Sequence, residues 1–185
     1  MPVILTGRLL RLRTICPEDI PDYERWNDPS LKAWETDGPW FTDDLTGLIA
    51  ARKKRLESEQ LPPYRSLEIE AGDGKHIGWV VVYYDSTDPH MTEIGIDIAE
   101  DAYWGKGYGK QALELWVDHL FRERGFTRLG FSTWSGNAGM IRLGEKLGFS
   151  EEARIRRGCE VKGVFYDRIK MGILREEWVD LHRDQ

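Results

Sequence analysis

Three glycines at alternate positions, Gly105, Gly107 and Gly109, stand between a stretch that alternates like a strand and one that repeats like a helix. Residues 93–98 place an isoleucine at every second position, which is typical of a half-buried strand. Residues 112–121 carry apolar side chains at helical spacing. Glycine at such a junction lets the backbone adopt left-handed conformations, or lets another group approach it closely.

Three kinds of glycine-rich loop suit a strand-to-helix junction, and two of them fail here. A Walker loop requires Gly-Lys followed by Ser or Thr, whereas Gly109-Lys110 is followed by Gln111. A dinucleotide fingerprint requires GxGxxG, a spacing that Gly105-Lys-Gly-Tyr-Gly109 does not have. The third kind is a pyrophosphate cradle, in which glycines let an anion reach the free N–H groups of the first helical turn, with Lys106 and Lys110 nearby. The alternative is a flexible turn that binds nothing.

Periodicity along the rest of the chain predicts alternating strands and helices. In the second half, strand, helix, strand, helix and strand follow one another, which favours a mixed α/β sheet. No linker or internal repeat divides the chain, so we expect one domain over residues 1–185. Strands are expected at 8–13, 64–71, 76–84, 92–98 and 128–133 and on both sides of 161–163, and helices at 16–26, 41–60, 107–124, 137–147 and 175–183.

Charge and cysteine content exclude several classes of protein. The net charge of −6 argues against a nucleic-acid binder with a basic surface. Cys16 and Cys159 form no CxxC pair, and the histidines have no metal-ligand spacing, so we expect no disulfide framework and no metal. Cys16 precedes Pro17 at a predicted helix start, where the pKa of a thiol can fall. Because no signal peptide or membrane-length apolar run is present, we expect a cytoplasmic protein without a membrane partner.

Two motifs resemble those of the GNAT acetyltransferases. Trp104-Gly-Lys-Gly-Tyr-Gly109 is similar to the family's coenzyme A motif, with Gly107 and Gly109 at its required glycines and Trp104 where Arg or Gln is usual. Residues 137–149, which begin with Asn and end in Glu-Lys-Leu-Gly-Phe, resemble its second signature. Residues 5–13 and 171–178 resemble the opening and closing segments of the ribosomal-protein N-terminal acetyltransferase branch. This resemblance implies the GNAT fold: a mixed, mostly antiparallel central sheet with splayed central strands, flanked by helices.

The resemblance also implies acetyl-CoA as the cofactor. In the family the strand at 93–98 splays from its neighbour, and the pantetheine arm of coenzyme A fills the gap. Asn137 matches an asparagine that contacts this arm, although Asn is also a favoured residue at a helix N-cap. The predicted cofactor-binding residues are Ile96, Ile98, Trp104, Gly105, Lys106, Gly107, Tyr108, Gly109, Lys110 and Asn137.

Two carboxylates are the candidate catalytic groups. Glu93 lies where the family often carries a glutamate that acts as general base. By strand alternation Asp97 shares the face of Glu93, and two nearby carboxylates raise the pKa of one of them. Asp97 is therefore a candidate second base or substrate contact; the alternative is a solvent-facing carboxylate pair. The predicted acceptor pocket is lined by Trp34, Trp40 and Tyr83.

The sequence departs from the family at the general acid. The position of the usual tyrosine is Gly144, and that of a serine used in the ribosomal branch is Met140. Water, or a tyrosine from elsewhere, would then protonate the thiolate; the candidates are Tyr64, Tyr83, Tyr84 and Tyr166.

We therefore expect an N-acetyltransferase that transfers acetyl from acetyl-CoA to a primary amine by direct attack. The acceptor stays open between a protein N-terminus, a polyamine and an amino-sugar or other small amine. Homodimers are common in the branch, so a homodimer is a further expectation. The rival hypotheses are a non-catalytic acyl-CoA-binding regulatory domain, which the missing acid leaves open, and a P-loop-like nucleotide binder, which Gln111 disfavours.

Overall fold

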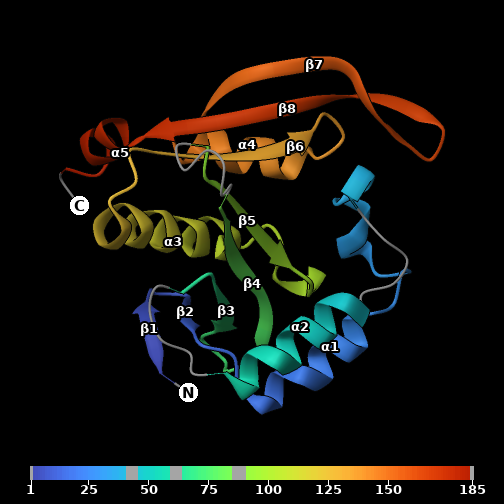
Figure 1. The fold of residues 1–185 in the computed structure, drawn as a ribbon, viewed down its shortest axis with the longest axis vertical. Coiled ribbons are helices and arrows are strands. Elements are labelled where there is room, and N and C mark those ends of the chain that lie inside the picture. The colour runs from blue at the N-terminus through green and yellow to red at the C-terminus, as the bar shows by residue number, and fades with distance from the viewer. Residues whose placement is uncertain (1, 41–45, 59–63, 85–90, 184–185) are drawn as a thin grey trace.

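A single mixed sheet organises the computed structural model, which describes residues 2–40, 46–58, 64–84 and 91–183. Its described strands run in the spatial order β1-β2-β3-β4-β5-β6-β8-β7 (Figure 1). Every neighbouring pair is antiparallel except β5 and β6, which are parallel. The strands are β1 (Val3–Thr6), β2 (Leu10–Arg13), β3 (Ser66–Ala71), β4 (His76–Tyr83), β5 (Glu93–Ile98), β6 (Arg128–Trp134), β7 (Ser150–Val161) and β8 (Val164–Leu174).

Helices cover both faces of this sheet. The long helix α3 packs on one face with α4 and α5, and α1 and α2 pack together against the other (Figure 1). Short 3-10 turns also occur along the chain, and two of these, η2 and η3, lie between α1 and α2 in the sequence. The described helical elements are η1 (Pro17–Asp19), α1 (Ile20–Trp26), η2 (Lys32–Glu35), η3 (Gly38–Trp40), α2 (Thr46–Glu57), η4 (Asp101–Tyr103), α3 (Tyr108–Arg124), α4 (Ala138–Lys146) and α5 (Arg175–Leu181).

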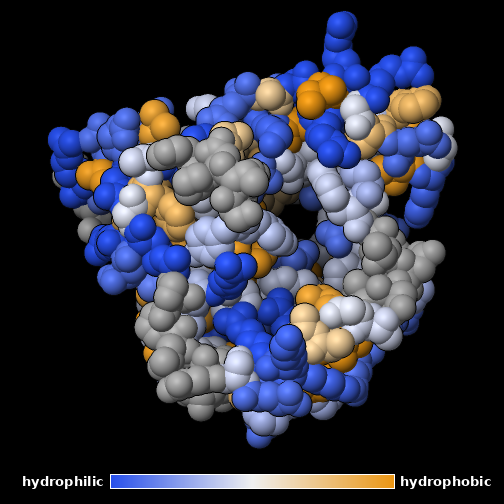
Figure 2. All heavy atoms as spheres, in the orientation of Figure 1, coloured by the Kyte–Doolittle hydropathy of each residue, from blue (hydrophilic) through white to orange (hydrophobic). Residues whose placement is uncertain are grey.

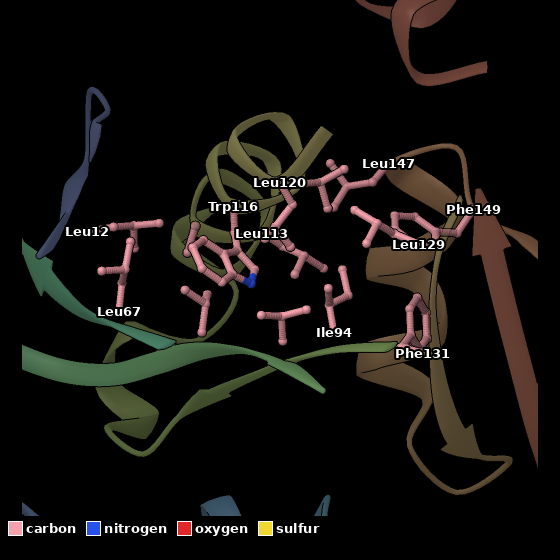
Figure 3. Packing of buried hydrophobic residues seen from close by; sticks show 14 of the residues in the cluster. Leu12, Leu67, Ile94, Leu113, Trp116, Leu120, Leu129, Phe131, Leu147 and Phe149 are labelled. Carbon is pink, nitrogen blue, oxygen red and sulfur yellow. The ribbon is translucent and has the colours of Figure 1, made fainter. Parts of the chain in front are cut away.

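The main core lies between the sheet and α3 (Figure 3). Leu113, Trp116 and Leu120 project from α3 and are fully buried against the strands. Ile94 of β5 belongs to the same cluster, and Ile96 and Ile98 pack against it. The isoleucine face of β5 is therefore the core face, as strand alternation predicts.

The centre of the sheet is splayed. Within the described residues, β5 and β6 are paired only at Glu93 and Gly130. On its other edge β5 follows β4 over its whole length, from Glu93 to Ile98. Beyond Glu93 the two parallel strands therefore separate, which leaves one edge of β5 without a neighbouring strand in the described part of the chain.

Most elements lie where periodicity predicts them. The predicted helix at 16–26 is η1 followed by α1, and the tail helix ends at Leu181. Strand β1 was not predicted, because four residues at a half-exposed sheet edge carry little periodic signal. Of the helix expected at 41–60, the structure contains α2, while residues 41–45 and 59–60 lie outside the described residues. No helix in the described ranges has the length and apolar character needed to cross a membrane.

Candidate active site

A cleft of about 1090 Å³ opens where β5 and β6 separate. Its walls are β5, the end of β6, the N-terminus of α3, one side of α4 and the segment from η2 to η3. Figure 2 shows this face of the molecule hollowed near its middle, in the region that lies in Figure 1 between β5 and the blue segment preceding α2. The cleft therefore joins the predicted glycine cradle to the predicted catalytic strand.

The glycine segment forms the N-terminus of α3. Gly105 and Gly107 have φ of 71° and 91°, in the left-handed region where a side chain is strained. Gly107 is the N-cap, and no side chain caps the helix. A Cβ added to Gly105 would meet nothing within 4 Å, so the backbone there is open. First-turn amides without a capping side chain, on a 17-residue helix, fit the phosphates of coenzyme A.

The side chains of this segment take different positions. Gly109 and Lys110 line the cleft, and Lys110 Nζ also lies 3.3 Å from Glu114 of the next helical turn. Lys106 is exposed, and Tyr108 packs edge-on against Tyr103 with ring centroids 5.1 Å apart. Neither Lys106 nor Tyr108 is part of the cleft wall, so their predicted contact with the cofactor stays a prediction.

Trp104 has a structural partner. Its indole Nε1 donates to the carbonyl oxygen of Ile98 at 2.8 Å, and the ring lies under Lys32 Nζ at 5.4 Å. This bond ties the glycine segment to the end of β5 and occupies one lone pair of a carbonyl that the resemblance assigns to the cofactor. Ile96 and Ile98 both line the cleft at the unpaired edge of the strand.

Asn137 is the N-cap of α4, where its Oδ1 accepts from the backbone N–H of Met140 at 2.9 Å. Its Nδ2 donates to the carbonyl oxygen of Thr36 at 3.1 Å, and Trp134 Nε1 donates to the same oxygen at 2.8 Å. Both ends of the Asn137 amide are thus engaged within the protein. Together Trp134 and Asn137 clamp the segment between η2 and η3 to the end of β6.

Glu93 is held by two partners that sequence reasoning missed. Its Oε1 accepts from Ser132 Oγ at 2.8 Å and from Lys170 Nζ at 3.1 Å. These residues come from β6 and β8, and nothing in their local sequence marks them. Glu93 lines the cleft as predicted, but it does so as one member of a hydrogen-bonded group.

Asp97 is in the opposite situation. Its side chain lines the cleft and has no hydrogen bond or ion pair with any residue that the structure describes. Burial, with a further contribution from the negative charge of Asp37, raises the pKa of Asp97 to about 7, against a smaller opposing effect of Arg52. Burial likewise raises the pKa of Asp37 to about 6. Asp97 and Glu93 line the same cleft, as strand alternation predicts, but the negative charge that raises the pKa of Asp97 is that of Asp37 and not that of Glu93.

Asp37 was not predicted, although a signal was present. It lies between Trp34 and Trp40, the two tryptophans predicted to line the acceptor pocket, and all three line the cleft. Trp34 is 4% exposed and its Nε1 donates to the carbonyl oxygen of Trp26 at 3.0 Å, whereas Trp40 is 43% exposed. The signal was an acidic residue between two aromatics predicted to line the pocket, because residues close together in a short turn can reach the same wall.

Tyr83 also lines the cleft, and it is the one of the four predicted tyrosines that does so in the described chain. The residue as a whole is 56% exposed, but its hydroxyl lies over Gly95 of β5. A Cβ added to Gly95 would be 3.4 Å from that hydroxyl. There, burial followed by the charges of Asp97 and Asp37 raises the pKa of Tyr83 to about 12. The hydroxyl is therefore protonated at neutral pH.

Gly144 has a packing explanation. A Cβ added there would lie 2.6 Å from Phe131 Cζ and 3.3 Å from Met171 Cε. The glycine lets α4 approach the sheet, and a tyrosine ring has no room at this position. Met140, where the branch can carry a serine, lines the cleft.

No cysteine or histidine of the described residues lines the cleft. Burial, with Glu18 and Asp19 nearby, raises the pKa of Cys16 to about 12, so its position at a helix start does not lower it. Cys159 is buried and its Sγ contacts the carbonyl oxygen of Tyr166 at 3.6 Å. Among the described residues no group of His, Cys, Asp and Glu could hold a metal ion.

Comparison with known sequences adds independent information. Residues 9–150 match the family model of the acetyltransferase (GNAT) domain. The chain is 29% identical over 174 residues, 94% of each chain, to YokL of Bacillus subtilis (strain 168), named as a prophage-derived uncharacterized N-acetyltransferase. It is 30% identical over 113 residues, 60% of this chain and 61% of the relative, to YdaF of the same organism, whose name marks it as a candidate ribosomal N-acetyltransferase.

Solved structures share the fold. SpeG of Vibrio cholerae, a spermidine/spermine N-acetyltransferase, superposes with a TM-score of 0.71 at 18% identity, covering 97% of this chain and all of that one. YncA of Salmonella typhimurium, solved with acetyl-CoA, gives a TM-score of 0.70 at 24% identity, covering 89% of this chain and 93% of that one. The splayed sheet and the cleft beside it therefore belong to a known architecture.

Proposed function

We propose that this chain, which belongs to the GNAT acetyltransferase family and uses acetyl-CoA, acts as one domain that acetylates a primary amine held beside Asp97. One observation carries the proposal. One cleft connects the glycine-lined N-terminus of α3, which no described side chain caps, to a carboxylate without a partner among the described residues, across the gap between β5 and β6. An anion site and a proton acceptor are the two groups that acetyl transfer to an amine most needs.

The cofactor end of the cleft is the positive one. The first-turn amides of α3 and the side chain of Lys110 would hold the phosphates, and the open edge of β5 would hold the pantetheine arm. When bound there, acetyl-CoA supplies an activated acetyl thioester. The residues of the chain bind and orient it, and keep the acceptor on the side of the cleft formed by η2, η3 and β5.

The acceptor end supplies the base. An amine attacks only when it is neutral, so a protonated amine must first lose a proton to the protein. Asp97 suits this role because its oxygens have no partner among the described residues and its pKa of about 7 lies near physiological pH. Glu93, the predicted base, already accepts hydrogen bonds from Ser132 and Lys170, which suits a residue that organises the floor of the cleft.

The test compares two matched amide substitutions, Asp97→Asn and Glu93→Gln, by thiol release from acetyl-CoA with a panel of amines. Loss of a general base costs roughly 100- to 10,000-fold in rate, so Asp97→Asn should lower kcat/KM by about that factor and remove the rise in rate near pH 7. Glu93→Gln should cost about tenfold or less and keep that rise. If Glu93→Gln abolishes the pH dependence and Asp97→Asn keeps it, the two roles are reversed.

Acetyl-CoA binding provides the control. Ligand at about 100 times its Kd adds roughly 2.7 kcal/mol to stability, which raises the Tm by several degrees in a protein of this size. Both variants should keep this shift, since neither residue lies at the helix N-terminus. A wild-type protein with no shift and no turnover would refute the proposed function, and a shift without turnover of any amine would favour the non-catalytic acyl-CoA-binding alternative.

A further inference from the structure

Asp37 occupies a fixed position opposite the catalytic strand. The preceding carbonyl, that of Thr36, accepts from Trp134 Nε1 and Asn137 Nδ2. A Cβ on Gly38 would lie 2.3 Å from the Trp134 ring, so the residue after Asp37 packs directly on the same indole. The backbone on both sides of Asp37 is therefore held by the end of β6 and the start of α4, which aims its carboxylate from one wall of the cleft.

Asp37 and Asp97 line the same cleft. Neither has an ion pair or side-chain hydrogen bond with a described residue. The nearby cations are engaged elsewhere. Lys170 pairs with Glu93 at 3.1 Å, and Arg52 donates to Ser66 at 2.7 Å. Two partly buried carboxylates that form no ion pair with a described residue favour a ligand that brings its own positive charge.

The aromatic walls suit such a ligand. Trp34 and Trp40 flank Asp37 in sequence and both line the cleft. The Trp40 ring already has the Arg168 guanidinium carbon 5.4 Å from its centroid, a distance at which a cation is attracted to an aromatic face. Indole rings beside a carboxylate bind both the charge and the methylene groups of an alkyl ammonium.

We propose that the acceptor is a small amine with a second positive charge, and that Asp37 binds the ammonium that is not acetylated while Asp97 takes the proton of the one that is. This inference rests on the proposed function and names its substrate class. A monoamine leaves one carboxylate unpaired once its ammonium has given up a proton. A diamine keeps its second ammonium on Asp37 throughout the reaction.

The reaction balances without a further reactant. Asp97 accepts one proton from the acceptor ammonium, and the nitrogen lone pair forms the N–C bond as the C–S bond of the thioester breaks. The second proton lost by that nitrogen, or the one held by Asp97, protonates the leaving thiolate, and the other returns to solvent. Nothing is oxidised or reduced, and the second ammonium is unchanged.

A protein N-terminus fits these walls less well. Next to its ammonium a peptide presents neutral amides, whose carbonyl oxygens are repelled by a carboxylate, rather than a second cation. The names of YdaF and SpeG point to these two different acceptors for those proteins. The charges of this cleft favour the amine with two cations.

The experiment compares 1,4-diaminobutane with butylamine, which has the same carbon chain and one charge, and with an alanyl tripeptide amide. In the wild-type protein kcat/KM should be at least 100-fold higher for the diamine than for butylamine, and higher than for the peptide. Asp37→Asn should reduce the ratio of diamine to butylamine at least tenfold. Glu35→Gln is the matched control, since Glu35 is an exposed acid of η2 outside the cleft wall, and it should leave the ratio unchanged.

Each outcome decides between the two proposals. A wild-type ratio near one, a ratio unaffected by Asp37→Asn, or a preference for the peptide would overturn the proposed acceptor class while leaving N-acetylation intact. No turnover of any of the three amines by a protein that binds acetyl-CoA would instead contradict the proposed function. The Tm shift with acetyl-CoA, expected to be unchanged in Asp37→Asn, verifies that the variant is folded.

Discussion

The protein contains two groups of buried carboxylates, and they behave in opposite ways. Beneath α1 lies an ion-pair network in which Arg13 contacts Asp19 at 2.7 Å and Glu70 at 2.5 Å. Beside it, His76 contacts Glu68 at 3.2 Å, and these five side chains are almost fully buried. In the cleft, Asp37 and Asp97 have no such partners in the described chain.

The pKa values follow the partners rather than the burial. Burial acts to raise the pKa of Asp19, but hydrogen bonds from Arg13 and the positive charge of His76 outweigh it, and the pKa is lowered. Burial also raises the pKa of Asp97, and there nothing outweighs it. A carboxylate whose geometry is satisfied within the protein stabilises the fold, whereas one that is buried without a partner is available for chemistry. The comparison therefore separates a cluster of paired carboxylates from two carboxylates that have no partner among the described residues.

The largest expected effect is a loss of stability when the ion-pair network beneath α1 is broken. Arg13→Met removes the buried cation that Asp19 and Glu70 share and leaves them with His76 and Arg11 as their remaining charged partners. Removing one partner of a buried ion pair costs about 3–5 kcal/mol. Urea unfolding followed by circular dichroism measures this loss. Arg11→Met is the matched control, because Arg11 also pairs with Glu70 but is 45% exposed, and an exposed pair contributes roughly 0–1 kcal/mol. Equal losses in the two variants would contradict the distinction between the clusters.

A smaller change, this time a gain in stability, is expected from a substitution of Asp97 in the cleft. Folded Asp97 keeps its proton up to about pH 7, whereas the unfolded chain loses it near 3.8, so this group makes the protein less stable as pH rises between these values. Asp97→Asn removes that loss. The variant should match the wild type at pH 4 and be more stable by on the order of 1–2 kcal/mol at pH 8, a figure reduced for the openness of the cleft to solvent.

Comparing the stability of the two proteins at several pH values separates the contribution of Asp97 from that of the ion-pair network. Burial acts to lower the pKa of His76, but its hydrogen bonds to Asp22 and Glu68 raise it to about 9, so its stabilising contribution is present below pH 6.5 and is lost as pH rises through 9. This loss of stability occurs in both proteins, so it cancels when the free energy of unfolding of the variant is subtracted from that of the wild type. A difference in stability that does not change between pH 4 and 8 would show that Asp97 is not perturbed.

The smallest effect concerns the clamp that positions Asp37. Asn137→Ser keeps an oxygen that can cap α4 but removes the amide donor to the Thr36 carbonyl. One lost hydrogen bond is worth about 1 kcal/mol, so kcat/KM for the amine should fall roughly fivefold, with acetyl-CoA affinity unchanged. Titration with acetyl-CoA and steady-state kinetics with the amine measure the two quantities. A weaker acetyl-CoA affinity with an unchanged amine KM would assign the Asn137 side chain to the cofactor instead.

Local pattern predicted most of the fold and the glycine-rich start of α3. The alternation of residues 93–98 predicted both the strand and its core face, and Gly105, Gly107 and Gly109 predicted the open start of α3. Such features are readable because strand period, helix period and glycine conformation depend on neighbours a few residues away. The amphipathic pattern of residues 112–121 likewise predicted the helix that buries Trp116.

The partners of the acidic side chains could not be predicted from local sequence pattern. Glu93 receives its hydrogen bonds from Ser132 and Lys170, which are 39 and 77 residues away, and Asp97 meets Asp37 across the cleft. Gly144 is small because Phe131 of β6 lies against it, a contact between two layers of the fold.

Most strands and helices, the glycine-rich start of α3 and a short set of candidate carboxylates could thus be predicted from the chain's local pattern. Which of these carboxylates is paired, and which has no partner among the described residues, followed from the folded structure. Protonation and hydrogen bonding depend on the groups within a few ångströms in space, and the folded sheet brings those groups together from distant parts of the chain.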